Sequence, residues 1–177
     1  MKLRKLLFWT LCCVLGFFGK TIISPVTNLL SDLTNIPGGI GTAFSLMFLV
    51  VAAECVPKFG CCALMGLVQG MLAIATGRIG AMGLLSPLGY ILPGMAIDLA
   101  LMFARSVRMK RICRTMTANI LASVTASLTA NLIVFRMKGT ALLMYLGTAA
   151  LCGAVCGLLA SRAAALAERA IGVKREK

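Results

Sequence analysis

The sequence contains no histidine, no Cys-x-x-Cys pair and only five acidic residues among 177. Histidine and closely spaced cysteines are the usual ligands of metal sites, so neither a metal centre nor another cofactor is expected. A catalytic site would need a cluster of carboxylates, histidines or an activated nucleophile. The acidic residues are dispersed along the chain, and we therefore predict that the protein is not an enzyme.

Charged residues are also scarce, at 13%, whereas 60% of the chain is hydrophobic. A soluble domain would need more polar surface to cover its core. The charges lie in short clusters between long apolar runs, each about the ~20 helical residues that cross a hydrocarbon core. These runs are continuous, whereas β-barrel strands alternate in polarity. The sequence predicts an all-α integral membrane protein.

We predict one domain of six transmembrane helices, a multi-pass protein of a bacterial-type plasma membrane with both termini in the cytoplasm. The spans are placed at about 6–24, 40–56, 59–76, 79–104, 115–135 and 140–160, with a basic cytoplasmic tail at 161–177. The first apolar run lacks a convincing cleavage site after it and is interpreted as a retained helix rather than a signal peptide.

The basic residues support this topology. Six spans place fourteen of the eighteen lysines and arginines on the cytoplasmic side, as the positive-inside rule requires. The outer side receives only Lys20, Arg78, Arg136 and Lys138. Because the basic clusters flank apolar spans and no aromatic residues are interleaved with them, the net charge of +13 does not indicate nucleic-acid binding.

The connections have their own signals. Residues 24–39 contain Pro25 and the turn-forming Pro37-Gly38-Gly39, which predicts an outer loop after the first span. Pro87 and Pro93 predict a kinked or locally unwound fourth span. A basic loop is expected at 105–114, and the tail from Ser161 is expected to leave the membrane as an amphipathic helix.

Gly19-Lys20-Thr21 imitates the end of a phosphate-binding loop. That loop needs an earlier glycine with four residues between the two glycines, and Val14 occupies its position. The loop also needs a strand before it, whereas an apolar helix is expected here. ATP hydrolysis by this route is therefore excluded.

Polar residues in the outer halves of the spans are candidates for a small-molecule pocket, because burying them in lipid is unfavourable. Arg78 and Arg136 equally suit simple anchors at the membrane interface. The candidate substrate-binding residues are Gln69, Thr76, Arg78, Ser86, Tyr90, Ser127, Asn131, Arg136 and Tyr145.

Small residues recur every four positions in the last span, at Ala149, Gly153 and Gly157, and Cys12 and Gly16 form a weaker pair in the first. Such stripes let helices approach closely. The contact is either with another helix of this chain or with a partner membrane subunit, and these five residues are the candidate partner-contact residues.

Two acidic residues lie inside or beside spans. Asp98 is expected either to pair with Lys58 or the nearby arginines, or to have a functional role. Glu54 precedes Lys58 by four residues, which suggests an ordinary interfacial ion pair.

The stretch from Pro57 to Leu64, the glycines between Gly77 and Gly83, and Pro93-Gly94 through Asp98 resemble S components of energy-coupling factor transporters. The resemblance is closest to the group linked to thiamine-precursor uptake. It covers the middle third by motif and the whole chain by layout, with the outer loop as a lid. The family's alanine-x-x-x-alanine pattern in the first helix is replaced here by Cys12 and Gly16.

This resemblance implies a substrate-binding subunit that captures a vitamin or related small molecule outside the cell. Its partners would be a transmembrane coupling subunit and two cytoplasmic ATPases. Span three has Gly66 and Ala73 where members of that group can carry acidic residues, so a neutral or anionic ligand suits Arg78 and Arg136 better. The alternatives are a stand-alone small carrier or channel and, less favoured, a membrane enzyme or assembly factor.

Overall fold

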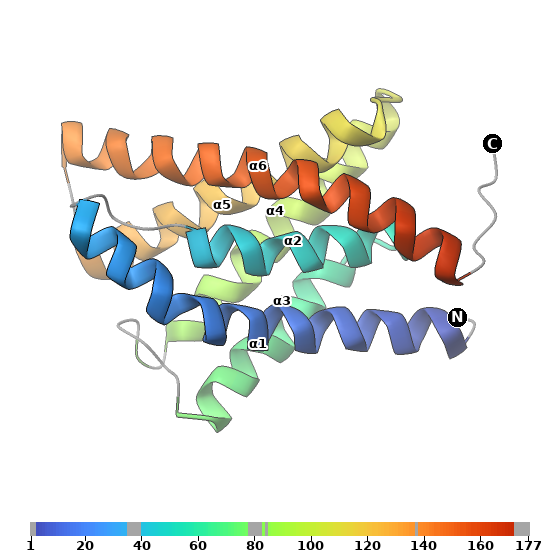
Figure 1. The fold of residues 1–177 in the computed structure, drawn as a ribbon, viewed down its shortest axis with the longest axis horizontal. Coiled ribbons are helices and arrows are strands. Elements are labelled where there is room, and N and C mark those ends of the chain that lie inside the picture. Colours follow the sequence, from blue (N-terminus) through green and yellow to red (C-terminus); the bar gives the residue numbers. More distant parts are fainter. Residues whose placement is uncertain (1–2, 35–39, 78–82, 84, 137, 172–177) are drawn as a thin grey trace.

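The computed structural model describes residues 3–34, 40–77, 83, 85–136 and 138–171. The chain is all-helical over these residues, as predicted. Figure 1 shows the helices alternating in direction along one bundle. They are α1 (Leu3–Thr34), α2 (Ile40–Cys55), α3 (Cys61–Ala75), α4 (Ser86–Ser106), α5 (Arg111–Ala130), a π-helical segment η2 (Asn131–Phe135) and α6 (Thr140–Ile171).

Four helical stretches are long and apolar enough to cross a membrane: Leu3–Val26, Ser86–Ser106, Arg111–Phe135 and Thr140–Ala170. The other two helices, α2 and α3, are apolar but have only 16 and 15 residues. The structure therefore supports a helical membrane protein, with four candidate membrane-spanning helices among the described residues.

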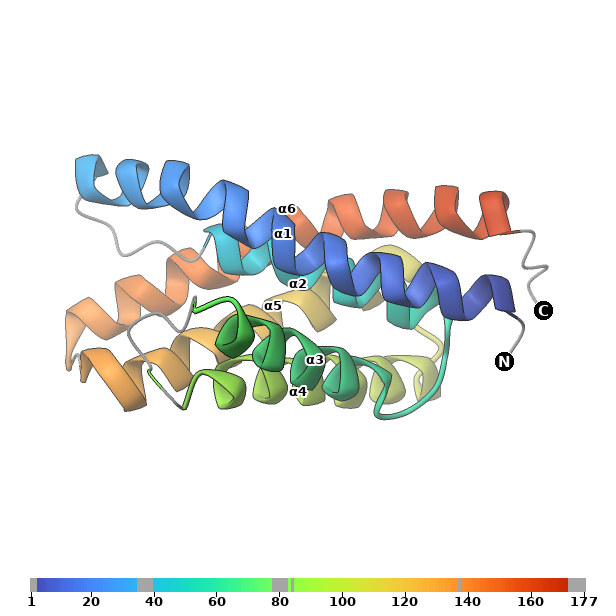
Figure 2. The same ribbon diagram turned by 90° about the horizontal axis from the view of Figure 1, so that it is seen from below.

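One end of the bundle, which we call the termini end, holds the start of α1, the end of α6 and the turns at 56–60 and 107–110 (Figure 1). The opposite end, where α1 finishes and α6 begins, is called the far end. In Figure 2, α3 and α4 lie side by side, on the opposite side of α2 from α6. This alternation brings the basic turns around Lys58 and Arg108 to the termini end.

The predicted outer loop is wrong over much of its length, because α1 continues through Pro25 to Thr34. A proline removes only its own N–H and crowds the carbonyl four residues earlier. The residues after Pro25 keep their donors, so the helix resumes at once. Residues 35–39, including the predicted Pro37-Gly38-Gly39 turn, lie outside the described residues.

Two other boundaries differ from the prediction. The fourth span begins at Ser86, and Pro87 lies in its first turn, where no N–H is required; only Pro93 is inside the helix. A kink at Pro87 is therefore wrong. The basic loop is also shorter than predicted, because Arg105 belongs to α4 and Arg111 already begins α5. The tail from Ser161 is helical as predicted as far as Ile171, because α6 is continuous to that residue.

Glycines permit two close helix contacts. A Cβ added to Gly66 of α3 would lie 2.3 Å from the carbonyl oxygen of Tyr90 on α4. A Cβ on Gly157 of α6 would lie 2.7 Å from the Cα of Met116 on α5, and one on Gly153 would meet the backbone of α5 at 3.0 Å. The backbones of these helix pairs touch, as small residues allow in membrane bundles.

The small-residue stripes therefore pack within the chain. The α6 stripe is buried in the bundle at Ala149, Gly153 and Gly157, and its two glycines pack against α5. The α1 pair, Cys12 and Gly16, is also buried. A side chain at Gly16 would collide with Gln69 of α3. In this conformation these five residues offer no surface to a partner subunit, and the internal-packing alternative accounts for them.

Candidate functional site

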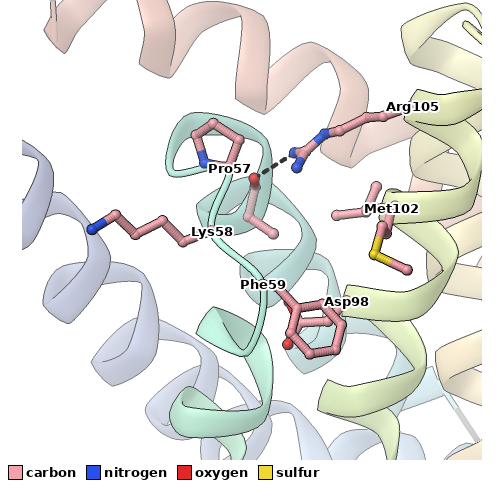
Figure 3. A pocket seen from close by; sticks show the side chains of 8 residues that line it. Pro57, Lys58, Phe59, Asp98, Met102 and Arg105 are labelled. Carbon is pink, nitrogen blue, oxygen red and sulfur yellow. Dashed lines mark hydrogen bonds between the residues drawn. The ribbon is translucent and has the colours of Figure 1, made fainter.

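A cavity of about 250 Å³ opens at the termini end, between the turn after α2 and the last two turns of α4 (Figure 3). The α4 residues that line it are spaced so that they share one helix face. The lining residues are Ala53, Pro57, Lys58, Phe59, Asp98, Leu101, Met102 and Arg105. Three of them, Lys58, Asp98 and Arg105, are ionisable.

Asp98 caps the neighbouring helix α3. Its Oδ2 accepts hydrogen bonds from the backbone N–H groups of Cys62 and Ala63 at 3.1 and 3.0 Å, and Oδ1 lies 3.3 Å from the N–H of Cys62. The first N–H groups of a helix have no partner within it and carry a partial positive charge. Although Asp98 is only 6% exposed, its charge is thus compensated by backbone.

The predicted pairing of Asp98 with Lys58 or an arginine is therefore wrong for the described residues, where Asp98 forms no ion pair. The guanidinium of Arg105 instead donates from Nη2 to the carbonyl of Ala53 at 2.8 Å. The same bond is drawn in Figure 3, where the side chain of Lys58 extends away from Arg105 towards α1. Lys58 is exposed.

Glu54 does not pair with Lys58 either. Its Oε1 accepts a 2.7 Å hydrogen bond from Nε of Arg114, and its Oε2 is bonded to the same guanidinium, so α2 is joined to α5 by a two-pronged ion pair. Helix α2 ends at Cys55, so Lys58 is not one helical turn above Glu54. A second ion pair, between Arg111 and Glu168, joins α5 to α6.

The predicted substrate residues are spread over several places. Ser127 and Tyr145 are both buried, and their side chains are hydrogen-bonded to each other across α5 and α6. The ring of Tyr145 also meets Phe135 edge to face, with 6.0 Å between ring centroids. The structure thus brings two predicted residues together near the far end.

The π-helical segment η2 lies beside this pair. The N–H of Arg136 donates to the carbonyl of Asn131 at 2.7 Å, five residues back. Asn131 is buried, whereas Arg136 is exposed and has a positive φ of 49°. π-Helical turns occur often at functional sites, because they re-aim side chains at the expense of regular helix geometry.

Gln69 and Thr76 each donate a hydrogen bond to a backbone carbonyl. Gln69 is 1% exposed, and its Nε2 donates to the carbonyl of Cys13 at 2.9 Å, joining α3 to α1. The hydroxyl of Thr76 donates to the carbonyl of Leu72 at 2.7 Å, one turn back in its own helix. Gln69 therefore acts in packing here, and Thr76 is satisfied by its own backbone.

The remaining candidates lie along α4. Ser86 is buried at its first turn, and the ring of Tyr90 lies 4.3 Å below the ammonium of Lys20 from α1. This cation–π contact holds Lys20 against the bundle. Arg78 lies outside the described residues.

None of the eight cavity residues belongs to the predicted pocket. The sequence signal for them was present in part, because Pro57, Lys58 and Asp98 belong to the segments that carry the family resemblance. The described residues contain no group of three His, Cys, Asp or Glu side chains that could hold a metal ion, and all eight cysteines are free.

Comparisons with protein-family models, with curated proteins and with solved structures found no match for this chain.

Proposed function

We propose that this chain is the substrate-binding membrane subunit, or S component, of an energy-coupling factor importer for a vitamin or related small molecule. The observation that carries the proposal is the buried polar group near the far end: Ser127 bonded to Tyr145, beside the π-helical segment that begins at Asn131. Buried hydroxyl and amide groups beside irregular helix are typical of ligand sites in membrane bundles.

In this proposal all six helices cross a bacterial-type plasma membrane, and the termini end faces the cytoplasm. The basic turns around Lys58 and Arg108, the start of α1 and the end of α6 lie at that end (Figure 1), in agreement with the positive-inside rule. The far end then faces outward and receives the ligand. A reporter fused after residue 177 tests this orientation. A reporter that works only in the cytoplasm should be active there, and one that works only outside the cell should be inactive.

The chain needs partners that supply energy, because it lacks a phosphate-binding loop of its own. We propose a transmembrane coupling subunit and two cytoplasmic ATPases. Since the small-residue stripes are buried, any coupling surface lies elsewhere, on exposed apolar faces such as that of α1 with Leu7, Leu11 and Phe18.

The test is purification of the tagged protein from its native membranes in mild detergent, followed by mass spectrometry of co-purifying proteins and retained small molecules. Recovery of a coupling subunit with two ATPases supports the proposal, and a retained small molecule names the cargo. If the protein is recovered alone and reconstituted vesicles still transport solute, it is a stand-alone carrier instead.

A further inference from the structure

The cavity at the termini end contains positive charge without a carboxylate partner. Three acidic side chains are described near this end: Glu54 is bonded to Arg114, Glu168 to Arg111, and Asp98 to the N-terminus of α3. Lys58 and Arg105 line the cavity, and neither is in an ion pair within the described part of the chain. The cavity is therefore suited to an anion.

The surroundings of the cavity are apolar and open. Phe59, on its wall, is 72% exposed. Along α4, Met102 at the cavity is followed towards the middle of the bundle by Leu99 and Met95, and all three are about half exposed. Residues spaced by three and four lie in one row on a helix, so a continuous apolar track runs from the charged cavity along α4.

We propose that this cavity binds the headgroup of an anionic phospholipid, whose acyl chain lies along the α4 track of Met102, Leu99 and Met95. Basic pockets between helices at a membrane surface are suited to anionic lipid headgroups. This inference is independent of the cargo and of the energy-coupling partners.

The side chains supply a fitting set of donors. A guanidinium has five N–H donors in a planar fork that matches phosphate oxygens, and among the described residues Arg105 makes one hydrogen bond, from Nη2 to Ala53. The exposed Lys58 side chain extends from the rim (Figure 3) and has four flexible carbons to bring its ammonium to the phosphate.

Asp98 argues for a lipid rather than a free phosphate. Its carboxylate stands on the cavity wall and repels a second negative charge, although the two N–H groups of α3 offset part of that repulsion. A dianionic phosphate has only the two cations to attract it. A phosphodiester carries one charge and gains further free energy by burying its chains against Phe59 and α4.

The experiment uses the full chain purified in mild detergent and freed of native lipid. Thermal unfolding is followed with added dioleoyl-phosphatidylglycerol, dioleoyl-phosphatidylcholine or inorganic phosphate, and native mass spectrometry counts bound lipid. The phosphatidylglycerol should raise the unfolding temperature by on the order of 5 °C, and the other two additives should have little effect.

Arg105→Gln removes the charge but keeps a donor for Ala53, and it should weaken phosphatidylglycerol binding by about tenfold. Arg105→Lys should recover part of the binding. The matched control is Lys110→Gln, which removes one exposed charge from the same end but outside the cavity. Lys58→Gln, a change at an exposed side chain, replaces Arg105→Gln if that variant does not fold.

Equal stabilisation by phosphatidylcholine would overturn the proposal, because no charge would be recognised. An equal loss in Lys110→Gln would also overturn it, since the attraction would then be diffuse. If inorganic phosphate reproduced the Arg105-dependent shift, the site would recognise phosphate alone and the lipid assignment would be wrong. None of these outcomes depends on the coupling subunit or the ATPases, so they leave the transport proposal to its own test.

Discussion

The two ends of the bundle are held together by different interactions. At the termini end, Glu54, Asp98 and Glu168 each bond to a neighbouring helix. Near the far end the described polar contacts are weaker: the Ser127–Tyr145 hydrogen bond, and Lys20 over the ring of Tyr90. Charged contacts in a low-dielectric setting are stronger and more directional than neutral ones. The termini end is therefore expected to stay closed while the far end opens.

The largest effect is expected at Glu54, whose side chain is 2% exposed. Glu54→Gln leaves the Arg114 guanidinium, which is only 15% exposed, without its counter-charge, and this should destabilise the protein by about 3 kcal/mol. Thermal unfolding in detergent measures this. The double variant Glu54→Leu with Arg114→Leu should recover most of the loss, because no unpaired charge remains.

Glu168→Gln serves as the internal comparison. The two arginines are about equally exposed, but Glu168 is 16% exposed against 2% for Glu54 and accepts one described hydrogen bond from Arg111 rather than two. This ion pair is better screened by water, so a smaller loss is expected. A loss in Glu168→Gln as large as that in Glu54→Gln would contradict the role given to burial.

The second-largest loss of stability is expected at the close contact between α3 and α4. Gly66→Ala places a methyl group 2.3 Å from the Tyr90 carbonyl and should destabilise the protein by about 2 kcal/mol. The matched control is Gly147→Ala in α6, where a Cβ meets no atom within 4 Å and where alanine is the better helix former. Equal unfolding temperatures for the two variants would mean that the helices do not touch as described.

Asp98→Asn tests the cap at the termini end. The neutral amide still accepts a hydrogen bond but loses the favourable charge at the helix N-terminus, so a loss of about 1 kcal/mol is expected. Hydrogen exchange should report it locally, with faster exchange at the amides of Cys62 and Ala63 than elsewhere in α3. Uniformly faster exchange over all helices would show that Asp98 acts on the whole bundle instead.

The smallest effect on stability is expected near the far end. Tyr145→Phe removes one neutral hydrogen bond, which averages about 0.6 kcal/mol in membrane proteins. If the proposed pocket is here, the same change should nevertheless reduce the amount of co-purified small molecule severalfold. Thr125→Val, at a hydroxyl that donates to the Leu121 carbonyl of its own helix, is the control for ligand retention.

The helices could be predicted well from the sequence, because long apolar runs bounded by charge leave few alternatives. The continuation of α1 through Pro25 could not, since a proline bars one hydrogen bond and its neighbours decide whether the helix resumes. The partners of Glu54 and Asp98 were also beyond reach. Glu54 bonds to a residue 60 positions away and Asp98 to backbone 35 and 36 positions away.

The candidate site was predicted less well than the fold. Ser127 and Tyr145 do meet, because they are placed on adjacent helices at a similar depth. Gln69 was indistinguishable from them by composition, yet it bonds to the backbone of α1. Whether a buried polar side chain bonds to a neighbouring helix or faces a pocket depends on how each helix is rotated in the bundle. The sequence alone does not give that rotation.

The unequal helix lengths have a consequence for the surrounding lipid. At 1.5 Å per residue, α6 with 32 residues measures about 48 Å, whereas α3 with 15 measures about 23 Å. A hydrocarbon core is about 30 Å thick. If α3 crosses the bilayer as we propose, its outward apolar side chains, such as Leu64 and Met71, match the lipid only where the bilayer thins beside them. The protein should therefore deform its membrane asymmetrically, with a local depression along the α3 side and tilted long helices on the other.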